Sequence, residues 1–245
     1  SCRNVWWSMA NEWDLMKEKQ AQDWDRFFCI VQDRDPCSHL RSIHNAGRWY
    51  DHTKPWVTHL SIQGDGFGRI PRLMDEYGKP LVFDEVCYEG NVSPIWGNIT
   101  AREMVHRFWL GFARGAYVGH GETYLHPEDI LWWGKGGVLH GQSPERIAFL
   151  RGIMEDAPST ELKPLSLGWD YIPCCGKEPD YYLHYFGNVQ PAERELKLPA
   201  EHRYTAEVID TWEMTVDRIE GAFSGECRVP LPGKPFIALR IRRKD

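Results

Sequence analysis

Residues 4–14 of this chain read Asn-Val-Trp-Trp-Ser-Met-Ala-Asn-Glu-Trp-Asp, an apolar and aromatic run that ends abruptly in Asn11-Glu12. Such a run predicts a buried strand that presents a carboxylate at its carboxyl end. Residues 80–85, Pro-Leu-Val-Phe-Asp-Glu, repeat this layout and end in Glu85. Because the carboxyl ends of parallel strands meet at one edge of a sheet, the two glutamates are predicted to form a pair.

A single glutamate after an apolar strand is often only the first solvated residue of a loop. Here there are two, Asn11 precedes one of them, and Trp13, Tyr88 and Trp96 lie close to them in the sequence. Aromatic side chains offer flat apolar faces that suit sugar rings. We therefore interpret the two glutamates as a catalytic pair.

Residues 1–157 alternate strands with helices of at least ten residues, which predicts βαβ units and a parallel sheet. Thr100 with Glu103 forms a capping box, and Ser143 is expected to cap the last helix. The polar connection from Ile43 to Trp56 is the exception to the alternation. Strands are expected at 4–10, 39–44, 55–63, 80–85 and 116–122, and helices at about 16–34, at 67–77, after Thr100 and after Ser143.

The pattern changes after Pro158. Prolines then separate short runs in which apolar and polar residues alternate, as in 181–186, 204–211 and 236–241. Five to seven short antiparallel strands are expected there, which is typical of a small β-sandwich. The predicted domains are therefore an α/β domain at 1–160 and a β-sandwich domain at 161–245.

Composition excludes some partners. Lys and Arg number 29 against 35 Asp and Glu, a net charge of −6 without a basic stripe, so we expect no nucleic acid and no membrane partner. No run approaches the roughly 18 apolar residues of a membrane helix, and none reads as a signal peptide. Seven Cys without paired zinc-type motifs favour reduced thiols and a cytoplasmic protein. Many of the 12 Trp must be core residues, but their number also suits a carbohydrate partner.

Several stretches, in order along the chain, resemble the apiosidase-like branch of the clan A glycoside hydrolases. These enzymes are (β/α)8 barrels of the TIM type with two catalytic carboxylates on strands four and seven, and bacterial members of the branch end in a small β-sandwich. The stretches that carry the resemblance are 8–16, 39–45, 84–91, 119–125 and, for the terminal domain, 209–214.

The resemblance implies a retaining glycoside hydrolase, with Glu12 as acid/base and Glu85 as nucleophile. Glu12 would have to keep a proton, which desolvation by Trp13 and repulsion by Glu85 would favour. The five strands would be strands four to eight, so this chain would be the C-terminal part of a barrel. Its open sheet edges would be covered by the missing N-terminal half, another chain or self-association.

The remaining candidates would bind substrate on the same face, and no cofactor or metal is expected. Asn11 would hydrogen-bond a hydroxyl next to the reacting carbon, and aromatic rings would stack on sugars. For each histidine taken singly, a buried structural role is an equal alternative. Asp14 and Glu89 are expected to orient their neighbours. The substrate-binding candidates are Asn11, Trp13, His44, His59, Tyr88, Trp96, His120 and Glu122, with Trp132 and Trp133 as further platforms or core residues.

Two other classes of function stay open. A metal-dependent hydrolase would use the cluster His120, Glu122, His126, Glu128 and Asp129, although its spacing matches no established ligand motif. A carbohydrate-binding protein without catalysis would retain glycan binding and show no turnover. The sequence does not identify the sugar, for which plant-type or other complex glycans are the expected class.

Overall fold

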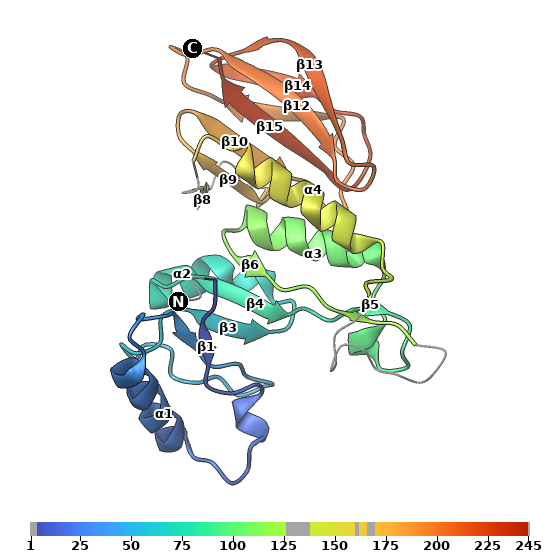
Figure 1. The fold of residues 1–245 in the computed structure, drawn as a ribbon. Coiled ribbons are helices and arrows are strands. Elements are labelled where there is room, and N and C mark those ends of the chain that lie inside the picture. The colour runs from blue at the N-terminus through green and yellow to red at the C-terminus, as the bar shows by residue number, and fades with distance from the viewer. Residues whose placement is uncertain (1–3, 126–137, 160–161, 166–169, 245) are drawn as a thin grey trace. The chain divides into compact units, whose positions relative to one another are not determined.

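The computed structural model describes residues 4–125, 138–159, 162–165 and 170–244 (Figure 1). The chain divides into two compact units, one formed by Ser1–Cys87 with Ala116–Gly121 and the other by Tyr88–Gly115 with Glu122–Asp245. These units are groups of residues that pack mainly against one another. They do not test the predicted domain boundary near residue 160, which stays a prediction. Among the helices described, none is long and apolar enough to cross a bilayer.

The first unit contains short parallel strands. β1 (Trp7–Ser8) pairs with β2 (Arg41–Ser42), and a three-stranded sheet has the order β3 (Leu60–Gln63), β4 (Leu81–Glu85), β6 (Tyr117–Val118). The helical elements are η1 (Trp13–Leu15), α1 (Ala21–Arg34), η2 (Phe67–Arg69) and α2 (Ile70–Tyr77). The parallel pairing is the arrangement that the alternation of strands and helices predicted.

Helix ends in the first unit follow local rules. Gly78 ends α2 at φ 58°, and its N–H donates to Met74 O at 2.9 Å, as the sequence predicted. α1 starts at Ala21 rather than near residue 16, because Gln20 and Asp23 cap it reciprocally there.

One expectation for the first strand is wrong. β1 spans only two residues, and the tryptophans at its start are not buried, since Trp6, just before the strand, is 51% exposed and Trp7 48%. Within the described residues β1 pairs with β2 alone, so its other edge has no partner strand. One apolar cluster of this unit lies instead around α1, where Trp13, Trp24 and Phe28 are buried.

The second unit is built on a six-stranded antiparallel sheet. Its order is β13 (Thr215–Phe223), β12 (Tyr204–Asp210), β15 (Ile237–Arg243), β10 (Tyr181–Tyr185), β9 (Cys174–Lys177), β8 (Lys163–Pro164). β11 (Glu193–Lys197) and β14 (Glu226–Pro230) form a separate antiparallel pair, and β5 (Glu89–Gly90) pairs in parallel with β7 (Glu122–Thr123). The remaining elements are η3 (Ile95–Gly97), α3 (Ala101–Ala113) and α4 (Ser143–Glu155).

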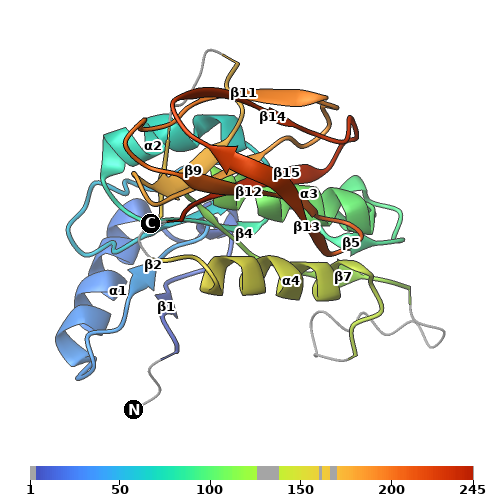
Figure 2. The ribbon, with the colours of Figure 1, turned by 90° about the horizontal axis from the view of Figure 1, so that it is seen from above.

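Both faces of the large sheet are covered. Side chains of Leu183 and Tyr185 pack with Trp109 of α3 and Leu150 of α4. Alternate residues of the same strands pack against β11 and β14, which Figure 2 shows on the side opposite α4. The sequence assigned α3 and α4 to the barrel and did not predict that they pack on this sheet.

Two further boundaries differ from expectation. The strand expected at 116–122 is two strands, of which β6 pairs with β4 and β7 pairs with β5. Gly119, the residue after β6, lies so close to β4 that a Cβ atom at this position would be 2.4 Å from Asp84 O. The N-cap of α4 is Gln142 rather than Ser143, whose hydroxyl instead donates to Glu89.

Candidate active site

Glu12 lies just beyond the carboxyl end of β1. The pairing of β1 with β2 continues as backbone hydrogen bonds from Met9 N to Ser42 O and from Trp13 N to His44 O, each 2.9 Å. Between them Glu12 adopts φ 48° and ψ 54°, a left-handed conformation that costs a non-glycine residue on the order of 1–3 kcal/mol. Strained backbone of this kind is concentrated at functional sites, so the outlier supports a functional role for Glu12.

Glu85 is the last residue of β4, and the side-chain amide of Gln63 lies between Glu85 and Glu12. Gln63 Nε2 lies 3.2 Å from Glu12 Oε1 and 3.4 Å from Glu85 Oε2, within hydrogen-bond distance of both. The two carboxylate oxygens are therefore separated by less than about 7 Å, the sum of those distances. Retaining glycosidases hold their carboxyl groups about 5–5.5 Å apart, within this limit.

A bulge in β4 aligns Gln63 with Glu85. Ile62 is opposite Phe83, but the next residue, Gln63, is opposite Glu85, so Asp84 is the extra residue on β4. Bulges of this kind re-aim side chains and are frequent next to active sites. Here the bulge brings the ends of β3 and β4 into the register that the contact between Gln63 and Glu85 requires.

His44 lies against both acidic residues of β4. Its Nε2 is 3.3 Å from Glu85 Oε1, and its Nδ1 is 3.5 Å from Asp84 Oδ2 and 3.1 Å from Ser61 Oγ. Ser61 Oγ in turn donates to Asp84. Burial alone lowers the pKa of His44, but its contacts with Asp84 and Glu85 outweigh burial and raise that pKa to about 9. An imidazolium beside Glu85 stabilises the ionised form of that carboxylate.

This position changes the interpretation of His44. The sequence placed it among the substrate contacts, but the residue is only 3% exposed and its ring contacts protein carboxylates. The positive charge of His44 thus lies against Glu85 rather than at an exposed surface. Ser61, Gln63 and Asp84 were not predicted as site residues. The sequence did contain one signal for Gln63, because this residue ends an apolar strand, as Glu12 and Glu85 do.

Asp14 fixes the loop after His44. Its carboxylate accepts three backbone N–H groups, from Ala46 at 2.7 Å, Gly47 at 2.8 Å and Arg48 at 2.7 Å. Burial raises the pKa of Asp14, but these hydrogen bonds lower it by more. Asp14, two residues from Glu12, therefore holds this loop, while its role in orienting a catalytic neighbour stays a prediction.

The other candidates in the first unit differ in exposure. Asn11 is exposed and His120 is half-buried. Trp13 is 4% exposed and packs edge-on to Tyr50 in the core, which leaves little of its surface for a sugar. His59 is 3% exposed, lies 3.1 Å from Thr58 Oγ1, and has its pKa lowered by burial. Both buried side chains thus have structural contacts.

The candidates in the second unit are Tyr88, Trp96 and Glu122. Tyr88 and Trp96 meet edge to face with ring centroids 5.9 Å apart, and Trp96 is 44% exposed, as a stacking platform requires. Glu122 is fully buried and accepts the N–H groups of His140 at 2.7 Å and Gly141 at 3.0 Å. These bonds give Glu122 a structural role beside the substrate contact that the sequence suggested.

Glu89 holds the start of α4 together with Glu122. It accepts the N–H groups of Gln142 at 2.8 Å and Ser143 at 3.1 Å and the hydroxyl of Tyr124 at 2.8 Å. Burial raises the pKa of Glu89, but the hydrogen bond from the Ser143 hydroxyl and the others lower it by more. Glu89 is thus an ionised, buried anchor for the start of α4, while its role in orienting a site residue stays a prediction. The candidates His126, Glu128, Asp129, Trp132 and Trp133 lie outside the described residues.

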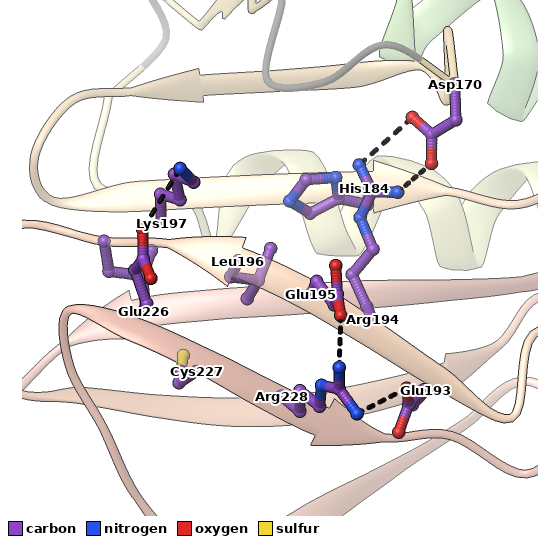
Figure 3. A pocket seen from close by; sticks show the side chains of 11 residues that line it. Asp170, His184, Glu193, Arg194, Glu195, Leu196, Lys197, Glu226, Cys227 and Arg228 are labelled. Atoms are coloured by element: carbon purple, nitrogen blue, oxygen red, sulfur yellow. Dashed lines mark hydrogen bonds and ion pairs between the residues drawn. The ribbon is translucent and has the colours of Figure 1, made fainter.

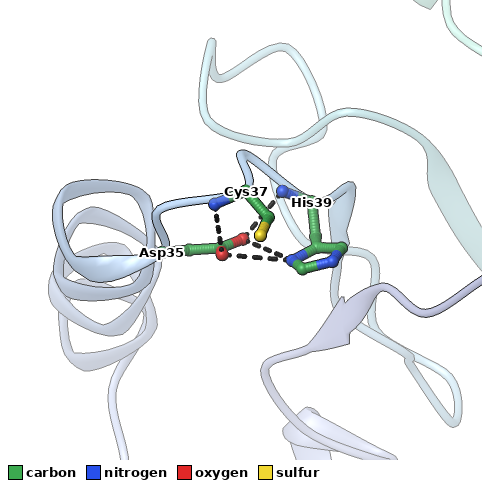
Figure 4. Close-up of side chains that lie close together, drawn as sticks. All are labelled: Asp35, Cys37 and His39. Carbon is green, nitrogen blue, oxygen red and sulfur yellow. Dashed lines mark hydrogen bonds and ion pairs between the residues drawn. The ribbon is translucent and has the colours of Figure 1, made fainter. Parts of the chain in front are cut away.

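One group of mixed metal-ligand types lies at the end of α1 (Figure 4). Ligand atoms of Asp35, Cys37 and His39 lie within 4.8 Å of one another. Asp35 already accepts the N–H groups of Cys37 at 3.0 Å and His39 at 2.7 Å and contacts the His39 ring at 2.9 Å. Burial raises the pKa of Asp35, but these bonds lower it to about 2. The donor set suits a metal, yet both carboxylate oxygens already serve to close the turn after α1.

A cavity of about 810 Å³ lies in the second unit, between β10 and the pair β11–β14 (Figure 3). Asp170 pairs with Arg194, Glu195 with Arg228 at 2.7 Å, and Glu226 with Lys197 at 3.1 Å. Within the described residues, these acidic groups are thus paired with arginine or lysine side chains. The cavity therefore lacks the arrangement that acid–base chemistry requires.

Several solved structures similar to this chain are glycoside hydrolases. A candidate glycoside hydrolase from Bacteroides vulgatus is 35% identical with a TM-score of 0.90, over 99% of this chain and 52% of that one. A family 5 glycoside hydrolase from the same organism is 16% identical with a TM-score of 0.70, over 89% of this chain and 58% of that one. A family 30 endoxylanase from Clostridium papyrosolvens is 12% identical with a TM-score of 0.56, over 97% and 65%.

The chain therefore shares its fold with glycoside hydrolases and spans about half the length of the first of these proteins. A family described as a domain of unknown function (DUF5605) matches residues 169–242. No curated protein sequence matches the chain.

Proposed function

We propose that this chain carries the catalytic carboxylates of a retaining glycoside hydrolase. The observation that carries the proposal is the single amide of Gln63 within hydrogen-bond distance of both Glu12 and Glu85. It holds two carboxylates from different strands at a separation compatible with double displacement. The shared fold with glycoside hydrolases supports the same reaction class.

In this reaction Glu85 attacks the anomeric carbon while Glu12 protonates the departing glycosidic oxygen. The bond to the leaving group breaks and a glycosyl ester forms on Glu85. Glu12, now ionised, takes a proton from water, which attacks the anomeric carbon and releases Glu85. His44 supports this division of roles, because its positive charge favours the ionised form of Glu85. Asn11, exposed beside Glu12, would hydrogen-bond a sugar hydroxyl.

The finer parts of the proposal concern fold and substrate. The parallel strands of the first unit would be strands four to eight of a (β/α)8 barrel, and residues 161–245 would be a β-sandwich domain. The family would be apiosidase-like, the substrate a plant-type or other complex glycan, and the location cytoplasmic. Activity would belong to a longer protein, since this chain matches 52% of its Bacteroides relative. For the same reason, a carbohydrate-binding fragment without turnover is the second candidate.

Covalent trapping tests the proposal in the full-length protein. A panel of dinitrophenyl 2-deoxy-2-fluoro glycosides of common pentoses and hexoses should inactivate the wild type and label Glu85, as located by peptide mass spectrometry. Glu85→Gln should abolish labelling, whereas Glu76→Gln, a change at an exposed ion pair of α2, should leave it intact. Glycan binding with no label and no turnover of the whole panel would favour the carbohydrate-binding candidate.

A further inference from the structure

Gln63 is the contact common to both proposed catalytic groups. It ends β3, opposite Glu85 across the bulge, and the chain then turns at Gly64, whose φ of 111° favours glycine. Gly64 N–H donates to Glu85 O at 2.7 Å, so backbone bonding also ties the two strand ends together. Strand pairing and this hydrogen bond thus fix the backbone from which the Gln63 side chain extends.

The orientation of the Gln63 amide follows from its neighbours. Nε2 faces Glu12 and Glu85, because the reverse orientation would place Oε1 against two carboxylates. Oε1 is buried and has no hydrogen-bond partner among the described residues. A buried acceptor without a partner costs free energy, so this glutamine is a poor choice for stability alone.

The contacts also distinguish the two oxygens of each carboxylate. Gln63 Nε2 faces Oε1 of Glu12 and so leaves Oε2 as the oxygen able to carry a proton toward a substrate. On Glu85, Gln63 faces Oε2 while His44 Nε2 lies 3.3 Å from Oε1, so both oxygens are held. The amide of Gln63 therefore contacts one oxygen of each proposed catalytic group, and only Glu12 keeps an oxygen that neither Gln63 nor His44 contacts.

We propose that Gln63 is a positioning residue that directs the proton of Glu12 to Oε2. The inference rests on the proposed glycosidase function and adds a residue to it. Proton donation matters most when the leaving group is poor. Removing the amide should therefore harm the cleavage of alkyl glycosides more than that of dinitrophenyl glycosides.

The test compares Gln63→Met, which keeps the length but removes the donors, with the wild type in the full-length protein. Gln32→Met, at an exposed glutamine of α1, is the matched control. For alkyl glycosides kcat should fall about 10- to 100-fold with KM within about 3-fold, and for dinitrophenyl glycosides kcat should fall less than about 5-fold. Thermal stability should not fall. Gln63→Leu, which also lacks the donors, should show the same dependence on the leaving group.

The outcomes separate the two claims. An equal fall of kcat for both substrate classes, or no fall for either, in the variant that folds overturns the role of Gln63. A wild-type protein that neither turns over nor is labelled by any glycoside of the panel overturns the proposed function itself. A selective loss with alkyl glycosides, absent in Gln32→Met, supports both.

Discussion

At the scale of single residues, the candidate site depends on asymmetry between two glutamates. Glu85 faces a protonated His44, whereas Glu12 follows an exposed Asn11 in a strained backbone. Environment of this kind sets which of two carboxylates stays ionised. The proposed assignment of nucleophile and acid/base comes from the family resemblance, and the positive charge of His44 beside Glu85 supports it.

Azide rescue tests that assignment in the full-length protein. Glu85→Ala should lose at least about 10³-fold in kcat, because no covalent intermediate forms. Glu12→Ala should keep partial activity on dinitrophenyl glycosides, which need little protonation. Azide should rescue Glu12→Ala to a glycosyl azide of retained configuration, identified by NMR. An inverted azide product from Glu12→Ala would mean that the two roles are exchanged.

The titration of His44 is a second prediction at this scale. Its pKa of about 9, above the ordinary 6.5, means that it stabilises the fold fully below pH 6.5 and that this stability is lost as pH rises through about 9. The contribution to the free energy of unfolding is at most about 3 kcal/mol. NMR of the ring in this chain should give a midpoint near 9 that falls in Glu85→Gln. A midpoint at or below 6.5 in the wild type would contradict the contact with Asp84 and Glu85.

At the scale of elements, short strands and helices are ended by single residues. Thr100 accepts the N–H of Glu103 at 3.2 Å and starts α3, and Gly78 ends α2 in the left-handed region. Such ends depend on neighbours within one turn, so they can be recognised in the sequence. The bulge that aligns Gln63 with Glu85 has no comparable local signature.

Gly78→Ala tests the end of α2. A Cβ at this position meets nothing within 4 Å, so any cost comes from φ 58° alone. We expect a loss of about 1 kcal/mol in the free energy of unfolding, measured by urea titration. Gly68→Ala is the matched control, because Gly68 also has open space but not a positive φ. Equal effects of the two changes would contradict this account.

At the scale of the whole molecule, each of the two units has a separate core. The six-stranded sheet of the second unit buries alternate residues on opposite faces, with Tyr182 toward β11 and β14 and Leu183 toward α3 and α4. Loss of a side chain on either face should therefore destabilise that unit. Its helices contribute to the same core as its strands.

Leu183→Ala measures that packing. Leu183 is fully buried, so the change should cost about 2–5 kcal/mol of unfolding free energy. Val216→Ala on β13, where the valine is 38% exposed, should cost less than about 1 kcal/mol. Calorimetry of this chain would compare the two. A small effect of Leu183→Ala would mean that α3 and α4 do not cover this face.

The sequence by itself determined the features that depend on near neighbours. Parallel pairing in the first unit follows from the alternation of strands and helices, and strands without a helix fill the described residues 170–244. The ends of α2 and the start of α3 follow from their capping residues. The sequence also selected Glu12 and Glu85, since each ends an apolar run, while their catalytic roles stay predictions.

Only the tertiary structure decided which side chains meet. Gln63 reaches both glutamates because of a bulge, and His44 is buried against Asp84 and Glu85, although the sequence placed it with the substrate contacts. Trp6 is exposed while Trp13 is buried, although both belong to one aromatic run. Burial and register depend on elements distant in the sequence, so periodicity, which reports only on neighbours along the chain, does not contain them.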